Sequence, residues 1–248
     1  MRTPIVLLHG VGLDHTMWGP FTRAAGHLTD RPVAAIDLPG HGGQPPLSRA
    51  TTLAELAEDV LARIPDRSHL VGFSLGALIA QHVARFHPER AASLTSVSSV
   101  CRRTASEAAA VASRLEMGAR DFPASVEASI ERWYPNGSGV GPEWVEATRA
   151  TLRANDVTSY LHAYRVFATG DADIGPELGN IRVPAFAVTG ELDPGSTPEM
   201  TRRLGEAIPG SRTAVVPGAR HMLPVQEADE LARLVTGFID ESTGATNA

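Results

Sequence analysis

The fold is decided by the stretch SHLVGFSLG at residues 68–76. Apolar residues at its start predict a buried strand, and the alanine-rich segment 77–86 predicts a helix directly after it. So sharp a turn strains the backbone at Ser74, and side chains at Gly72 and Gly76 would collide with the neighbouring strand and helix. The serine hydroxyl would then stand exposed beside a helix N-terminus, whose free N–H groups favour negative charge. The alternative is a small-residue connection in which Ser74 only caps the helix.

Strands and helices alternate on both sides of this stretch. Further strands are predicted at 4–9, 33–37, 92–98, 183–189 and 212–216. Helices are predicted at 18–28, 52–64, 198–208 and 228–239, followed by a polar tail at 241–248. Thr51 or Thr52 can serve as the N-cap of the second helix. This order is typical of a mostly parallel α/β sheet with helices on both faces, and we expect about six strands.

The alternation stops between residues 102 and 178. Four helices are predicted there instead, at roughly 105–117, 123–133, 142–154 and 157–168. All three tyrosines and two of the three tryptophans of the chain lie in this segment, which favours a helical cap over a pocket. We therefore expect a core of residues 1–101 and 179–248, with a cap of residues 102–178 inserted after the fourth strand. A helical insertion whose aromatic residues only pack on the core is the alternative.

The composition limits the functional classes. The 248 residues include 22 basic and 28 acidic ones, a net charge of −6, and no basic run, so neither nucleic acid nor a membrane is an expected partner. All basic residues are arginine, which excludes lysine Schiff-base chemistry. The sole cysteine, Cys101, permits no internal disulfide, and the apolar run Ile5–Leu8 is too short for a signal peptide, so we expect a cytoplasmic protein. The histidines show no metal-ligand spacing, so neither a metal nor another cofactor is expected.

A serine is a weak nucleophile unless a base removes its proton and an acid orients that base. For a serine on this kind of turn, the acid and then the histidine follow in the chain. Asp193, in the loop after strand 183–189, is the candidate acid, and Glu191 competes with it. His221, in the loop after the last strand, is the candidate base. Each residue follows a predicted strand, where the active sites of open α/β sheets lie, although a turn aspartate and a surface histidine are the alternatives.

An acyl-transfer site also needs two backbone N–H groups to hold the oxyanion. Leu75, directly after the serine, is the first candidate. Val11, in the loop after the first strand, is the second, because Gly10 and Gly12 on either side of it let the backbone approach a substrate carbonyl.

These motifs together resemble those of the cap-bearing α/β-hydrolases, over essentially the whole chain. The resemblance rests on His9-Gly10, Asp37–Gly42, the pentapeptide around Ser74, Gly190–Asp193 and His221. Within that superfamily the helical block is similar to that of the 3-oxoadipate enol-lactonases, in Ser129–Trp133, Tyr160–Ala172 and Ile181–Pro184, and the His-Pro-Glu-Arg stretch at 87–90 is similar to small carboxylesterases. Many of these enzymes begin with an antiparallel hairpin, for which this chain has only residues 1–3, so we expect an exposed sheet edge.

The resemblance implies that a small-molecule ester or lactone is hydrolysed in two steps through an acyl-enzyme. It also implies a substrate pocket under the helical block, for which the candidates are Trp133, Tyr134, Tyr160, Tyr164, Arg132 and Arg165. The two arginines could pair with a substrate carboxylate, the alternative being exposed helix arginines.

Three other functions are open. Carbon–carbon hydrolases of ring-cleavage products share the same catalytic residues, and a binding protein could keep them without turnover. Gly10-Val11-Gly12 weakly resembles a dinucleotide-binding turn, but the third glycine, due at position 15, is His15. No feature of the sequence indicates the oligomeric state.

Overall fold

A six-stranded parallel sheet forms the centre of the computed structural model, which describes residues 2–244. Its strands, in chain order, are β1 (Ile5–Leu8), β2 (Val33–Ile36), β3 (Ser68–Phe73), β4 (Ala91–Val97), β5 (Ala185–Gly190) and β6 (Arg212–Val216). In space their order is β2-β1-β3-β4-β5-β6, and each neighbouring pair is parallel. The predicted number and direction of the strands are confirmed, and β2 and β6 are the edges.

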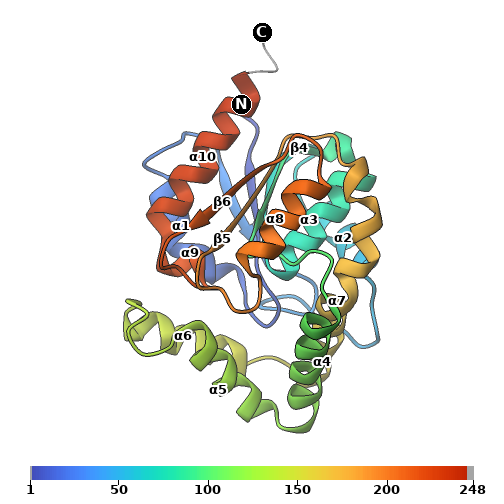
Figure 1. The fold of residues 1–248 in the computed structure, drawn as a ribbon, viewed down its shortest axis with the longest axis vertical. Helices are drawn as coiled ribbons and strands as arrows, with labels where there is room; N and C mark the ends of the chain where they lie inside the picture. The colour runs from blue at the N-terminus through green and yellow to red at the C-terminus, as the bar shows by residue number, and fades with distance from the viewer. Residues whose placement is uncertain (1, 245–248) are drawn as a thin grey trace.

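Helices cover both faces of this sheet (Figure 1). One face carries α2 (Leu53–Arg63), α3 (Leu75–Phe86) and α8 (Pro198–Ala207), and the other carries α1 (Gly19–Ala25), α9 (Leu223–Gln226) and α10 (Ala228–Gly244). Alternate residues of β1 serve the two layers. Val6 and Leu8 pack in the core with α2 and α3, whereas Ile5 and Leu7 pack with α1 and α10. The strand is therefore buried on both faces, as its continuous apolar sequence predicts.

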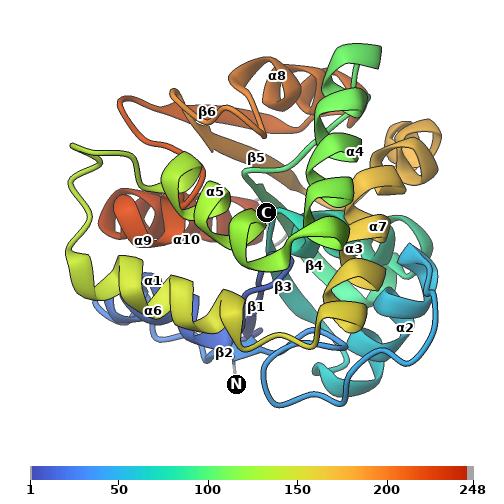
Figure 2. The ribbon, with the colours of Figure 1, turned by 90° about the horizontal axis from the view of Figure 1, so that it is seen from below.

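Between β4 and β5 the chain forms the four predicted additional helices. They are α4 (Ala105–Arg120), α5 (Phe122–Trp133), α6 (Pro142–Arg153) and α7 (Val157–Ile174), and a 3₁₀ segment, Gly175–Asn180, leads from α7 back to β5. Figure 2 shows α4, α5 and α6 lying across one end of the sheet. These three helices therefore stand over an end of the sheet, whereas α7 packs against α2 and α3.

Several boundaries differ from the prediction, for tertiary reasons. Helix α7 continues to Ile174 instead of ending at residue 168. Gly170, in this extension, lies where α7 packs on α3, and a Cβ there would be only 3.1 Å from Leu78 Cδ1. Helix α10 continues to Gly244, and the Thr243 hydroxyl donates to the carbonyl oxygen of Ile239 at 3.0 Å. Residues 245–248 of the predicted polar tail lie outside the described residues. The four-residue helix α9 was not predicted, since it is too short to show a periodicity.

A buried ion pair joins the two ends of the inserted segment. Arg103, just after β4, donates to Asp171, near the end of α7, with Nη1 2.5 Å from Oδ1. Both side chains are almost completely buried, at 4% and 6% exposure, and the guanidinium lies over the ring of Phe167 at 4.8 Å. The pair keeps the two ends of the inserted segment in contact. Removing either partner would leave an uncompensated buried charge, which is strongly destabilising.

The N-cap of α2 is one of the two threonines that the sequence predicts. Thr52 rather than Thr51 caps α2, and its hydroxyl accepts the N–H of Glu55 while the Glu55 carboxylate accepts the N–H of Thr52.

Among residues 2–244, no helix combines the length and the apolar character that a membrane span requires.

Candidate active site

The turn at Ser74 has the geometry that the sequence predicts. Ser74 lies between β3 and α3 with a backbone φ angle of 54°, a value that residues other than glycine rarely adopt. A Cβ on Gly72 would lie 2.2 Å from the carbonyl oxygen of Gly76, and one on Gly76 would lie 2.3 Å from the carbonyl oxygen of Leu8. Only glycine therefore fits at either position, and the close packing keeps the serine in its strained conformation.

Asp193 and His221, predicted from two separate loops, are in direct contact. Nδ1 of His221 lies 2.7 Å from Oδ2 of Asp193, and both side chains are buried, at 8% and 0% exposure. Because a carboxylate can only accept, the imidazole carries its proton on Nδ1 and leaves Nε2 free as a base. The other carboxylate oxygen of Asp193 accepts the N–H groups of Gly195 and Ser196, each at 2.9 Å. The acid is thus held in one orientation by its own loop.

Glu191, the alternative acid, has a different role. Its carboxylate accepts the N–H of Gly218 at 2.9 Å, at the turn that follows β6. This contact shapes the loop that carries His221 and does not reach the imidazole itself. Between the two acids, only Asp193 makes the contact that a catalytic histidine needs.

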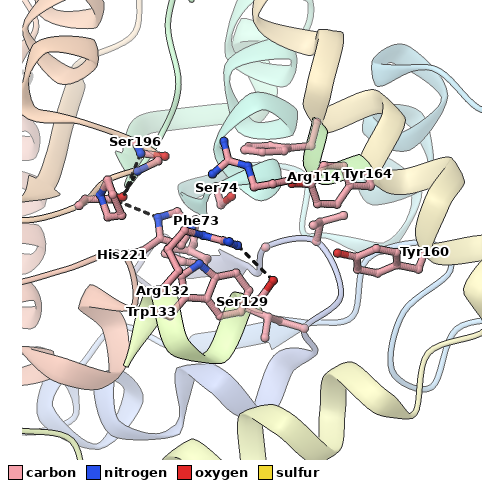
Figure 3. Close-up of a pocket in the computed structure, with 17 residues that line it drawn as sticks. Phe73, Ser74, Arg114, Ser129, Arg132, Trp133, Tyr160, Tyr164, Ser196 and His221 are labelled. Atoms are coloured by element: carbon pink, nitrogen blue, oxygen red, sulfur yellow. Dashed lines mark hydrogen bonds and ion pairs between the residues drawn. The ribbon is translucent and has the colours of Figure 1, made fainter. Parts of the chain in front are cut away.

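Ser74 and His221 line the same cavity, together with Asp193 (Figure 3). Within the described part of the chain, the Ser74 hydroxyl makes no hydrogen bond to the imidazole, a separation often seen in enzymes without substrate. The imidazole is held by aromatic rings. Its centroid lies 4.9 Å from that of Phe73 and 5.6 Å from that of Trp133, and the Trp133 ring is stacked at 27°.

The backbone N–H groups of Val11 and Leu75 have no hydrogen-bond acceptor among residues 2–244, although both residues are buried. The next amide, Gly76 N–H, donates to the His9 carbonyl at 3.1 Å. Unpaired buried N–H groups are rare in folded proteins. Leu75 directly follows the strained Ser74 and Val11 lines the same cavity as Ser74, so these two N–H groups are the candidates for holding a negatively charged oxygen.

His9 fixes the loop that carries Val11. Its Nε2 accepts the N–H of Leu38 at 2.9 Å, and its Nδ1 donates to the carbonyl of Gly10 at 2.7 Å. Complete burial lowers the pKa of His9 to about 3, so the ring is neutral at pH 7 and can accept from Leu38. Asp37, at the end of β2, anchors the neighbouring loops by accepting the N–H groups of His15 and Gly43, at 2.8 and 2.9 Å.

The cavity beside Ser74 is lined mainly by aromatic and apolar side chains with a few polar groups, as small-molecule sites usually are. Four of the six predicted pocket residues line it: Arg132, Trp133, Tyr160 and Tyr164. Tyr134 and Arg165 are not among the residues that line it. Tyr134 follows the end of α5, where the chain changes direction, and its hydroxyl lies 3.0 Å from that of Thr148. Arg165 is exposed, because one step along α7 from Tyr164 turns the side chain by about 100°.

Sequence reasoning missed several residues of the cavity wall. They are Arg114 on α4, Ser129 on α5, Phe167 on α7 and Ser196 in the Asp193 loop. A helical pattern alone does not tell which polar position of α4 or α5 faces inward, so no signal in the sequence identified Arg114. Within residues 2–244, no group of histidine, cysteine or acidic side chains is arranged to hold a metal ion.

Known proteins resemble the chain in sequence and in structure. It is 32% identical to a pimeloyl-[acyl-carrier protein] methyl ester esterase of Chromobacterium violaceum, over 95% of this chain and 94% of that protein. It is 26% identical to an (E)-2-((N-methylformamido)methylene)succinate hydrolase of Acinetobacter baylyi, over 96% and 90%. The enol-lactonase from Burkholderia xenovorans LB400 superposes with a TM-score of 0.83 at 26% identity, covering 97% of this chain and 92% of that one.

The sequence profile described as "Alpha/beta hydrolase family" matches residues 5–234. This span contains the whole sheet, the inserted helices and the loops that carry Ser74, Asp193 and His221. The chain belongs to the alpha/beta hydrolase family.

Proposed function

We propose that this protein is a serine hydrolase that cleaves a carboxylic ester or lactone through an acyl-enzyme. The observation that carries the proposal is the buried Asp193–His221 contact at 2.7 Å, in the wall of the cavity that also contains Ser74. The relatives support it, because their printed names include a methyl ester esterase and an enol-lactonase. The mixture of aromatic side chains and a few polar groups in the cavity wall suits a small-molecule substrate.

In the first step, His221 Nε2 takes the proton of the Ser74 hydroxyl while the serine oxygen attacks the substrate carbonyl. The negative charge that develops on the carbonyl oxygen is held by the N–H groups of Val11 and Leu75, an effect of roughly 3 kcal/mol for each donor. The imidazolium, stabilised by Asp193, then returns its proton to the leaving alkoxide, and the acyl group stays on the serine. Water repeats the attack with the same base and releases the acid.

We further propose that residues 102–178 act as a cap over this site, with residues 1–101 and 179–248 as the catalytic core. The proposal is supported by which elements contribute the residues of the cavity wall. Arg114 comes from α4, Trp133 from α5 and Tyr164 from α7, whereas the reacting groups come from loops that follow β3, β5 and β6. In this arrangement the inserted helices select the substrate, and the sheet loops perform the reaction.

A fluorophosphonate probe tests the nucleophile. We expect the probe to label Ser74, and Ser74→Ala to abolish both labelling and the hydrolysis of 4-nitrophenyl esters. Ser48→Ala, at an exposed serine, is the matched control and should keep both. Labelling of a different serine would contradict the proposal. Labelling of Ser74 with no turnover of esters, lactones or dienones would indicate a binding protein, and turnover of dienones alone would indicate carbon–carbon cleavage.

A further inference from the structure

Two guanidinium groups line the candidate catalytic cavity without a carboxylate partner. Arg114 on α4 and Arg132 on α5 both belong to the cavity wall with Ser74, and Figure 3 shows both side chains extending toward the serine. Neither forms an ion pair with any acidic residue in the part of the chain that the structure describes. Arg114 makes no hydrogen bond there either, and its Nε is buried without a partner.

Arg132 has only neutral acceptors. Its Nη2 donates to the Ser129 hydroxyl at 3.1 Å and its Nη1 to the Ala128 carbonyl at 3.4 Å, and the guanidinium lies 5.8 Å from the ring centroid of Trp133. Burial and then the positive charge of Arg114 lower the pKa of Arg132. The two cations are therefore close enough to repel each other, and of the acidic residues in residues 2–244 only Asp193, which forms no ion pair with either arginine, partly offsets this repulsion at Arg132.

Asp193 is the one acidic residue among those that line the cavity, and its carboxylate contacts the His221 imidazole. The buried Arg103 lies outside the lining and is paired with Asp171. Two arginines against one aspartate leave an excess of one positive charge, in a chain whose net charge is −6. Burying a cation without a counter-ion is costly, and here much of the surrounding wall is aromatic. A ligand that brings one negative charge would neutralise the site.

We propose that the substrate carries a free carboxylate in addition to the ester or lactone carbonyl, and that Arg114 and Arg132 bind this carboxylate. The inference rests on the proposed hydrolase function and specifies its substrate class. A single carboxylate matches the excess charge of one, whereas a phosphate would bring close to two, and the planar guanidinium fork suits a carboxylate well. The oxyanion donors, Val11 and Leu75, are backbone groups of the core and separate from this pair.

A matched pair of substrates tests the inference. Mono-4-nitrophenyl glutarate has a free carboxylate where 4-nitrophenyl valerate has a methyl group, and the two acyl chains have equal length. We expect the wild type to prefer the glutarate ester by about 10-fold or more in kcat/KM. Arg114→Gln and Arg132→Gln should each lower kcat/KM for the glutarate ester by about 10- to 100-fold, mainly through KM, and should leave the valerate ester within about threefold.

Three controls complete the experiment. Arg120→Gln, at an exposed arginine of the same helix α4, should change neither substrate, and Arg114→Lys should recover part of the preference. Free glutarate should slow fluorophosphonate labelling of Ser74 in the wild type and much less in Arg114→Gln, a readout that needs no turnover. Circular dichroism establishes that each variant is folded.

The outcomes separate the two proposals. If the valerate ester is hydrolysed as well as the glutarate ester and the arginine variants slow both equally, the carboxylate inference fails and the hydrolase proposal stands. If neither ester is hydrolysed and Ser74 is not labelled, the hydrolase proposal fails, and with it the inference.

Discussion

The indole of Trp133 lies nearly parallel to the imidazole of His221, with ring centroids 5.6 Å apart and an interplanar angle of 27°. Trp133 belongs to α5 of the inserted segment, whereas His221 belongs to a loop of the sheet. Phe73, from the strand before Ser74, contacts the same imidazole at 4.9 Å. A residue of the inserted helices thus packs directly against the proposed base, and we propose that this contact orients the imidazole.

Replacing Trp133 tests this positioning. We expect Trp133→Leu, which fills much of the space but stacks no ring, to lower kcat by about 10-fold for small neutral esters. Trp133→Phe keeps a stacked ring and should retain most of the activity. Steady-state kinetics with 4-nitrophenyl acetate, which is too small to need the cap for binding, provides the measurement. Equal activity of the two variants would show that the stack has no role in orienting His221.

Asp193→Asn tests the acid. The amide can present an N–H to the imidazole and favour the wrong tautomer, so we expect kcat to fall by about 10⁴-fold while the fold is kept. Glu191→Gln is the matched control, because Glu191 contacts the Gly218 turn and not the imidazole, and its kcat should change by less than about threefold. A larger loss in the Glu191 variant than in the Asp193 variant would reverse the assignment of the acid.

Gly76→Ala should be strongly destabilising. Its Cβ would lie 2.3 Å from the backbone oxygen of Leu8, which cannot move without displacing β1, so we expect a loss of more than about 2 kcal/mol in the free energy of unfolding. Gly237→Ala on α10 meets no atom within 4 Å and should instead stabilise the protein by about 0.5–1 kcal/mol through helix propensity. Urea denaturation measures both, and equal stability of the two variants is the result that would contradict this account of the turn.

Stability should decrease in acid because of His9. The folded protein resists protonation of His9, whose pKa is lowered to about 3, whereas the unfolded chain binds this proton below about pH 6.5. The unfolded state therefore holds more protons between these pH values, and the free energy of unfolding falls as the pH decreases through this window, by up to about 1.4 kcal/mol per pH unit for this residue.

His9→Gln isolates this contribution. Glutamine can still offer an acceptor to the N–H of Leu38 but does not titrate. Urea denaturation at several pH values between 4 and 6.5 should give a slope that is smaller in the variant than in the wild type by about one proton's equivalent. Identical slopes would show that His9 is protonated in the folded protein.

The sequence predicted the parts of the site that depend on local rules. Ser74 is identifiable because a strand that turns directly into a helix needs glycine at positions 72 and 76, where a side chain would clash with backbone atoms. Asp193 and His221 were identified because parallel strands bring the loops at their carboxyl ends to the same edge of the sheet. The structure brings these two side chains into hydrogen-bond contact, as the proposed mechanism requires.

The cavity wall could not be predicted in the same way. Arg114 and Arg165 both lie on helices that the sequence predicted, but only the packing of α4 and α7 determines that the first faces the cavity and the second faces solvent. Tyr134 directly follows Trp133 in the chain, but α5 ends at Trp133, and only Trp133 lines the cavity. Pocket residues depend on helix rotation and helix ends, which a hydrophobic pattern leaves uncertain by a residue or two.

The buried contact between Arg103 and Asp171 has a consequence for how such proteins diversify. The inserted helices begin after β4 and end before β5, and these two strands are neighbours in the sheet. Because Arg103 and Asp171 are in contact, the two ends of the inserted segment lie close together, and its helices form a module. A module of this kind can be exchanged for another of different length without shifting a strand. New specificities can therefore arise by swapping that module, while the reaction chemistry is inherited unchanged.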